Sequence, residues 1–167
     1  RVGWVGDSVT QQSDNSQTQT WILHASGKFT AANSDLPQFD LSSKQSECNQ
    51  VINVNKFYQS CEKQGINYGN NFQAINQLCH DEKVALAEIV LPESVESTAY
   101  ELHPILLDAS LQVVGSVLPD NQTYLPIGIN NFTFFGTTSN VLWSYVELDK
   151  NENKKNNNNN NSSLITA

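Results

Sequence analysis

The apolar positions of the chain change their spacing several times, and each spacing predicts a different element. After residue 50, apolar side chains recur at three- and four-residue intervals, at Val51, Val54, Phe57, Tyr58 and Cys61. This spacing is typical of one face of an amphipathic helix. Gly65 follows where a helix commonly ends in the left-handed conformation. The pattern therefore predicts a short helix that ends before Gly65.

Stretches rich in aromatic and aliphatic residues predict strands. The polar turn Asp81-Glu82-Lys83 separates two such stretches, so residues 72–80 and 84–91 are expected to form a β-hairpin that Pro92 ends. Further strands are predicted over residues 21–30, 124–135 and 140–149.

The longest apolar stretch covers residues 102–118, with Pro104 in its first turn and Pro119 just beyond its end. Proline is tolerated in the first turn of a helix, and a helix that is apolar nearly all round is mostly buried. Several antiparallel strands and one long buried helix together predict an α+β domain in which the sheet wraps around the helix.

The last segment, residues 151–167, has a different composition. It contains Lys154-Lys155 followed by six consecutive asparagines, and such a segment cannot bury enough apolar surface to fold. We expect it to be a disordered linker, which leaves residues 1–150 as the folded module. The chain contains no methionine and opens on Arg1, so we expect it to be a piece of a longer protein.

Length and charge exclude several classes of function. A chain of 167 residues suits one domain with a real core, and no apolar run approaches the roughly 20 residues of a membrane helix. The net charge is −8, which argues against nucleic acid or an anionic membrane as partner, because both attract clustered Lys and Arg. The three cysteines are far apart and odd in number, which favours reduced thiols and a cytoplasmic location.

One pair of polar residues in the apolar helix could carry chemistry. Asp108 and Gln112 are four positions apart, so both project from one helix face. Burial disfavours the charged form of a carboxyl group, which can keep an acid protonated and useful as a proton donor. Gln112 could hydrogen-bond the acid or a substrate oxygen. In the alternative interpretation, Asp108 caps a backbone group or bonds a buried serine.

His103 immediately precedes this helix. Histidine is the most common general base, but at this position it can equally bond the backbone at the helix start. The spacing of the His and Cys residues does not match a zinc site.

Three segments together resemble the dehydratase domains of type I polyketide synthases and animal-type fatty acid synthases. Residues 103–112 begin with His-Pro and carry an Asp-x-x-x-Gln pattern, like the family's Asp-x-x-x-Gln/His helix. Residues 65–72 are similar to Gly-Tyr-x-Tyr-Gly-Pro-x-Phe, except at Ile66 and Asn70. Residues 125–129 resemble Leu-Pro-Phe-x-Trp, with isoleucine at both aromatic positions. The resemblance covers about residues 20–149.

The family fold is a double hotdog, in which two consecutive modules each wrap a sheet around a long helix. The chain resembles the C-terminal module. The family's catalytic histidine lies in a His-x-x-x-Gly-x-x-x-x-Pro motif of the N-terminal module. That motif is absent here, since His24 has glycine at the third following position and His103 has none at the fourth. The resemblance therefore places the base in an N-terminal hotdog half of the same chain.

The resemblance implies removal of water from a 3-hydroxyacyl thioester on an acyl carrier protein, giving a trans-2-enoyl thioester. Asp108 would be the general acid, and Gln112 would orient it or the departing hydroxyl. No cofactor is implied within the domain, because the phosphopantetheine arm arrives with a tethered carrier protein; the synthase is expected to be homodimeric. Substrate-binding positions, unless they are plain core residues, would be Tyr68, Gly69, Phe72, His103, Leu125 and Pro126.

Two other functions remain open on the sequence. The departures from the family motifs at Ile66, Asn70, Ile127 and Ile129 are compatible with a non-catalytic hotdog module that serves only synthase architecture. A product-template domain, which guides cyclisation of poly-β-keto chains, would share the fold. Such domains resemble an Asp-x-x-x-Asn pattern more than the Asp-x-x-x-Gln of this chain.

Overall fold

The computed structural model describes residues 25–28, 30, 38–97, 99–119, 122–136, 139–148 and 165–166. The chain divides into two compact units, residues 1–35 and residues 36–167. In the first unit, residues 25–28 and 30 have no regular structure, so the strand predicted over residues 21–30 is wrong at these positions. The rest of that predicted strand lies outside the described residues.

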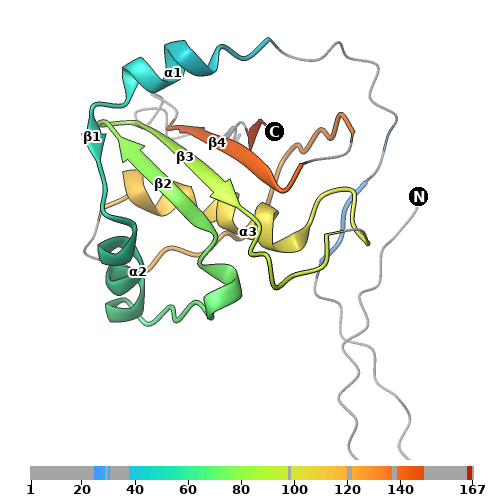
Figure 1. The fold of residues 1–167 in the computed structure, drawn as a ribbon, viewed down its shortest axis with the longest axis horizontal. Coiled ribbons are helices and arrows are strands. Elements are labelled where there is room, and N and C mark those ends of the chain that lie inside the picture. Colours follow the sequence, from blue (N-terminus) through green and yellow to red (C-terminus); the bar gives the residue numbers. More distant parts are fainter. Residues whose placement is uncertain are drawn as a thin grey trace, which may run out of the picture. The chain divides into compact units, whose positions relative to one another are not determined.

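The second unit contains one antiparallel sheet with the order β1-β2-β3-β4-β5 (Figure 1). The predicted hairpin is confirmed: β2 covers Ile75–His80 and β3 covers Val84–Val90. The strand predicted over residues 140–149 is confirmed as β4, Val141–Glu147, which pairs with β3 along its whole length. Two short strands flank these, β1 at Gln50–Val51 and β5 at Ile165–Thr166.

The predicted central helix is present, but it is shorter than expected. Helix α3 covers Pro104–Gln112 and continues as the 3-10 helix η2 at Val113–Val117. Valine and glycine, which occupy four of the five η2 positions, have lower helix propensity than the leucine-rich stretch before them. This accounts for the tightening of the last turns into a 3-10 helix.

Helix α3 approaches the sheet closely because small residues line the contact. Ala85 and Ala87 of β3 and Ala109 of α3 are fully buried in the same core cluster. Ser144 of β4 donates a hydrogen bond from its Oγ to the carbonyl oxygen of Ser110, at 3.2 Å. The predicted α+β arrangement, an antiparallel sheet around a buried helix, is therefore confirmed.

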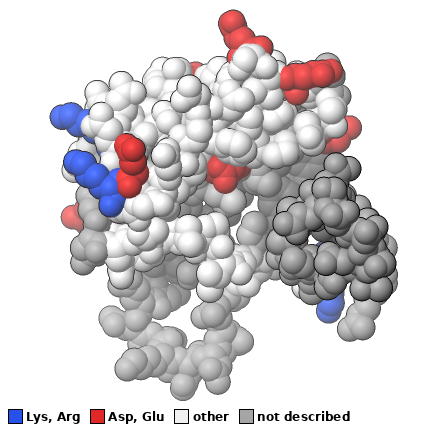
Figure 2. Space-filling view, turned by 90° about the horizontal axis from the view of Figure 1, so that it is seen from below, with Lys and Arg blue, Asp and Glu red and all other residues white. Residues whose placement is uncertain are grey.

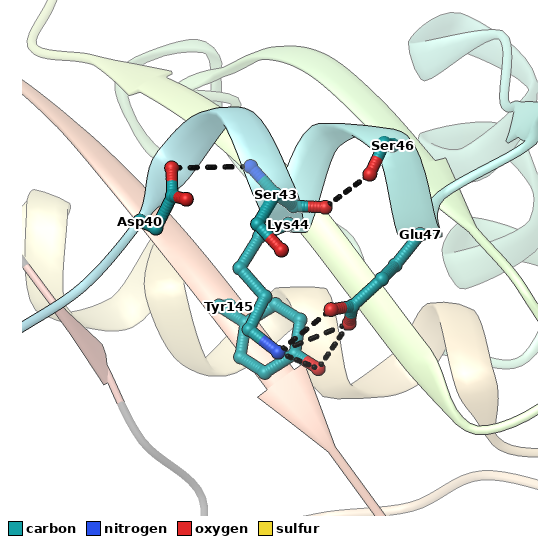
Figure 3. A network of polar contacts seen from close by, with 6 residues as sticks. All are labelled: Asp40, Ser43, Lys44, Ser46, Glu47 and Tyr145. Atoms are coloured by element: carbon teal, nitrogen blue, oxygen red, sulfur yellow. Dashed lines mark hydrogen bonds and ion pairs between the residues drawn. The ribbon is translucent and has the colours of Figure 1, made fainter.

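A second, smaller cluster covers the opposite face of the sheet beneath helix α1, Leu41–Glu47. Beside Tyr145 of this cluster, Lys44 Nζ lies 3.0 Å from both carboxylate oxygens of Glu47 and 4.5 Å from the ring centroid of Tyr145 (Figure 3). The Tyr145 hydroxyl also bonds Glu47, at 3.2 Å. These contacts fasten α1 to β4. The sequence did not predict α1, because six of its seven residues are polar and show no apolar periodicity.

The helix predicted after residue 50 begins later than expected. Gln50 and Val51 pair with β2 instead, and helix α2 covers Val54–Lys63 with Asn53 as its cap. Gly65 has a φ of 89°, which confirms the predicted left-handed end. A 3-10 turn, η1 at Asn70–Phe72, then leads into β2.

The strand predicted over residues 124–135 is wrong. Residues 122–136 form no helix or strand, and all of them are exposed. A strand needs a hydrogen-bonded neighbour, and none of the described strands pairs with this segment. Of the predicted disordered linker, residues 151–164 and 167 lie outside the described residues, whereas Ile165–Thr166 pair with β4.

Candidate active site

Asp108 and Gln112 meet on one side of α3, as the spacing predicted. Gln112 Nε2 donates a hydrogen bond to Asp108 Oδ2 at 2.7 Å. Asp108 is half-buried, whereas Gln112 is only 7% exposed. The carboxyl group thus retains access to a reactant, while the amide that holds it is shielded from water.

Two elements outside α3 hold the Gln112 amide. Its Nε2 also donates to the carbonyl oxygen of Phe72 at the end of η1, at 3.0 Å. Its Oε1 accepts a hydrogen bond from the hydroxyl of Tyr58, a buried residue of α2, at 3.0 Å. The Tyr58 oxygen in turn accepts the backbone N–H of Ile75, at 3.3 Å. The Gln112 amide therefore accepts one hydrogen bond at Oε1 and donates two hydrogen bonds from Nε2.

Sequence reasoning missed the contribution of Tyr58. The apolar spacing placed Tyr58 on the buried face of its helix, and a buried tyrosine hydroxyl needs a hydrogen-bond partner. The sequence could therefore have indicated that the Tyr58 hydroxyl has a hydrogen-bond partner. The spacing of a helix does not identify the distant side chain that supplies this partner. The backbone carbonyl of Phe72 left no signal in the sequence.

His103 caps helix α3. Its Nδ1 accepts the backbone N–H of Ile105 at 3.1 Å, and its ring packs edge-on against Tyr100, with centroids 4.9 Å apart. Because Nδ1 accepts a hydrogen bond, a neutral ring carries its proton on Nε2. The backbone bond foreseen as the alternative for His103 is present, and its contact with substrate stays a prediction.

The second predicted motif lies beside Gln112. Tyr68 is half-buried and packs edge-on against Tyr58, with ring centroids 5.9 Å apart. Burial, with smaller contributions from Cys61 and Asp108, raises the pKa of the Tyr68 phenol. Gly69 caps η1 and its carbonyl accepts the N–H of Phe72 at 2.8 Å, while the Phe72 side chain is 42% exposed. The structure thus brings this motif together with Asp108 and Gln112.

The third predicted motif lies in the exposed segment. Leu125 is 68% exposed and Pro126 is exposed as well. No hydrogen bond of the described residues joins either of them to the Asp108 cluster. The described part of the chain leaves these two positions open to a further partner.

Other kinds of site have little support in the described residues. Among them, no three His, Cys, Asp or Glu side chains gather as metal ligands would. No helix of the described part combines the length and apolar character needed to cross a membrane. A cavity of about 620 Å³ borders Cys48, Ile52 and Trp143, and its described lining contains no carboxylate, imidazole or amine. Asp108 and Gln112 do not line this cavity.

Comparison with known proteins identifies the relatives of this arrangement. A family model described as "Polyketide synthase dehydratase N-terminal domain" matches residues 36–166. The chain is 32% identical over 139 residues to polyketide synthase PksN of Bacillus subtilis, a match that covers 79% of this chain and 2% of PksN. The chain thus belongs to the dehydratase domains of polyketide synthases. The description of the family model names an N-terminal domain, whereas the motifs of this chain resemble the C-terminal module.

Solved structures agree in fold. The chain is 38% identical, with a TM-score of 0.65, to an inactive mutant of the CurK dehydratase in which aspartate is replaced by asparagine. It is 40% identical, with a TM-score of 0.64, to an inactive CurK mutant in which histidine is replaced by phenylalanine. These matches cover 71% and 70% of this chain, but only 45% and 44% of the CurK chains. The chain therefore spans less than half of these solved dehydratases, and a small fraction of PksN.

Proposed function

The chain belongs to the dehydratase domains of polyketide synthases, and on that premise we propose that it is the C-terminal half of a catalytic dehydratase. Its fold is the α+β hotdog fold of its structural neighbours. The proposed reaction removes water from a 3-hydroxyacyl thioester on an acyl carrier protein and gives a trans-2-enoyl thioester. The observation that carries the proposal is the half-buried carboxyl of Asp108, which the buried amide of Gln112 holds at 2.7 Å.

The reaction needs one base and one acid. A base removes the proton next to the thioester carbonyl, and the electron pair of that C–H bond becomes the new carbon–carbon double bond. The β-carbon–oxygen bond breaks as Asp108 gives its proton to the departing hydroxyl, which leaves as water. We assign the base to a histidine of an N-terminal hotdog half, since the chain lacks the motif that carries it.

The structural neighbours support both assignments. The two CurK dehydratases described as inactive mutants carry one change each, an aspartate to asparagine and a histidine to phenylalanine. An aspartate and a histidine are the two residue types that the proposed mechanism needs. We propose that Asp108 has the same role in this chain as the substituted aspartate has in the CurK dehydratase.

Two further observations support a missing partner half. The chain covers only 45% of the CurK structure, as expected for one of two similar modules. The segment of residues 122–136 exposes apolar side chains, among them Leu125, Ile127 and Phe132. Large exposed apolar patches mark surfaces that another body covers. We propose that the N-terminal half covers this segment and completes the acyl tunnel with Leu125 and Pro126.

The remaining substrate contacts are proposed from their position. The Phe72 carbonyl accepts a hydrogen bond from the Gln112 amide, Tyr68 packs against Tyr58, and the Gly69 carbonyl bonds the Phe72 N–H. On this basis we propose that Tyr68, Gly69 and Phe72 line the tunnel next to the acid. His103 is 7% exposed and caps the helix that carries Asp108, and we propose that its ring borders the substrate. No cofactor is needed within the domain, because the phosphopantetheine arm belongs to the carrier protein.

The carrier protein itself is expected to be tethered. On the face drawn in Figure 2, acidic side chains are spread over the described surface and lysines gather mainly at one side. With a net charge of −8, such a surface does not steer an acidic carrier protein at low salt. Tethering within one cytoplasmic synthase, which we expect to be homodimeric, raises the effective concentration and replaces steering.

The test uses the complete dehydratase domain, with the upstream segment fused to this chain. Conversion of a 3-hydroxyacyl thioester is followed for the wild type, for Asp108→Asn and for Asp40→Asn. Asp108→Asn is expected to lower kcat by at least about a hundredfold. Asp40→Asn makes the same chemical change at the cap of α1, where asparagine caps equally well, and should retain full activity.

A different outcome would support the alternative. An Asp108→Asn variant within a few-fold of wild type would exclude the acid role of Asp108. A wild-type domain that folds but does not dehydrate the thioester would favour a non-catalytic hotdog module of the synthase, in line with the motif departures at Ile127 and Ile129.

A further inference from the structure

We propose that Tyr58 is a positioning residue for proton transfer: its hydroxyl fixes the Gln112 amide, which reserves Oδ1 of Asp108 for the transferred proton. The inference rests on the proposed function, since it concerns how Asp108 acts as the acid. It assigns a task to a side chain of α2 that itself has no hydrogen bond to Asp108 among the contacts described.

The direction of the Tyr58 hydrogen bonds follows from their partners. The backbone N–H of Ile75 can only donate, so the Tyr58 oxygen accepts it. The hydroxyl proton of Tyr58 is then free for its other neighbour, Oε1 of Gln112 at 3.0 Å. Burial raises the pKa of this phenol, so the hydroxyl keeps its proton throughout the neutral range.

The orientation of the Gln112 amide follows in the same way. The carbonyl oxygen of Phe72 can only accept, so it selects the NH₂ side of the amide. The Tyr58 hydroxyl selects the oxygen side. A flipped amide would set its oxygen against the Phe72 carbonyl and Oδ2 of Asp108, which both accept, and would turn its NH₂ group toward the Tyr58 hydroxyl proton. Two elements distant in sequence, α2 and η1, thus enforce one orientation.

This orientation determines which oxygen of Asp108 can carry a proton. The second NH₂ proton of Gln112 points at Oδ2, at 2.7 Å, so Oδ2 is an acceptor. In the neutral carboxyl group the proton therefore sits on Oδ1, for which the described residues supply no hydrogen-bond partner. When the O–H bond at Oδ1 breaks, its electron pair stays on Asp108 and its proton goes to the leaving hydroxyl.

The position of Tyr58 is itself well defined. The residue is 8% exposed, and its ring packs edge-on against Phe57 and Tyr68, with centroids 5.4 and 5.9 Å away. Phenylalanine at this position keeps these ring contacts and removes only the hydroxyl. Tyr58→Phe is therefore a close test of the hydrogen bond.

The experiment measures dehydration by the complete dehydratase domain carrying Tyr58→Phe, Gln112→Ala or both. Tyr58→Phe is expected to lower kcat about tenfold, with KM within about twofold of wild type, since the hydrogen bond that directs the amide is lost. The hydrogen bond from the Ile75 N–H is lost with it, and its effect appears in the melting temperature. In the Gln112→Ala background, the same change should have almost no further effect, because the hydroxyl acts through the amide. Tyr145→Phe removes a buried hydroxyl on the other face of the sheet and should leave kcat unchanged.

Three outcomes would overturn the inference. These are an unchanged kcat in Tyr58→Phe, an equal loss in both backgrounds, and a loss in Gln112→Ala smaller than that in Tyr58→Phe. Melting temperatures of all variants are measured alongside. The kcat values of Gln112→Ala and Tyr58→Phe can be compared even if Tyr58→Phe lowers the melting temperature. If Asp108→Asn stays active, the proposed function fails; if only Tyr58→Phe stays active, this inference alone fails.

Discussion

Gln112 donates a hydrogen bond to Asp108 across one turn of α3, with 2.7 Å between the amide nitrogen and the carboxylate oxygen. Such a contact between positions i and i+4 can form on any helix and is weak when exposed. Here Gln112 is buried, and Tyr58 and Phe72 hold its amide from outside the helix. The tertiary contacts thus turn an ordinary helical pair into a fixed support for one carboxyl group.

Removal of the Gln112 amide should destabilise the fold as well as the reaction. Gln112→Leu leaves the buried Tyr58 hydroxyl and the part-buried Phe72 carbonyl without the amide that bonds them. We expect the free energy of unfolding to fall by about 1–3 kcal/mol, measured from urea denaturation of the chain. Gln73→Leu removes an exposed amide that bonds the Tyr68 carbonyl and should change stability by less than about 0.5 kcal/mol. Equal losses in both variants would contradict the role of burial.

Gly65 should be sensitive to any side chain. Its φ of 89° lies in the left-handed region, where a Cβ atom costs about 1–2 kcal/mol. A Cβ at Gly65 would meet no atom within 4 Å, so the cost of Gly65→Ala is backbone strain alone. Gly115→Ala is the control, since its Cβ meets only Phe57 at an ordinary 3.8 Å. Thermal melting should show a lower transition temperature for Gly65→Ala than for Gly115→Ala.

Cys48 should resist alkylation. Burial, together with a hydrogen bond to Cys79, raises the pKa of the Cys48 thiol to about 12. At pH 8 only about one molecule in ten thousand then carries the reactive thiolate. After brief treatment with iodoacetamide, peptide mass spectrometry should find Cys48 unmodified in the folded chain and modified in urea. Rapid modification of the folded chain would contradict the raised pKa.

The same thiol gives a pH dependence of stability. The unfolded chain loses the Cys48 proton near the ordinary pKa of 9, whereas the folded chain keeps it to about 12. The folded state therefore binds more protons between these values, and stability falls as the pH rises from 9 to 12. Cys48→Ala should reduce this slope in urea denaturation at several pH values. An unchanged slope would show that other groups set it.

The chain expressed alone should self-associate through the segment of residues 122–136. Ile127 is fully exposed and Leu125 is 68% exposed in this segment, and such apolar surface favours association in water. Ile127→Lys should shift the chain toward monomer in analytical ultracentrifugation. Val51→Lys is the matched control, because Val51 is 87% exposed but belongs to strand β1. A wild-type chain that is monomeric at high concentration would contradict this prediction.

Elements with their own periodic signal were predictable. The β2–β3 hairpin, β4 and the core of α3 have alternating or continuous apolar patterns, and a polar turn or a proline marks their ends. Helix α1 was missed because its stability comes from contacts of Lys44 and Glu47 with Tyr145, about a hundred positions away. The strand over residues 124–135 was predicted from composition, but a strand forms only where a neighbour supplies its hydrogen bonds.

The sequence by itself determined the family, the helix that carries Asp108 and Gln112, and the placement of both residues on one helix face. These follow from local geometry, because a helix brings positions four apart together wherever it forms. Only the tertiary structure decided which way the Gln112 amide points. That orientation depends on a hydroxyl from α2 and a carbonyl from η1, whose approach to α3 is set by packing of the core and not by any spacing along the chain.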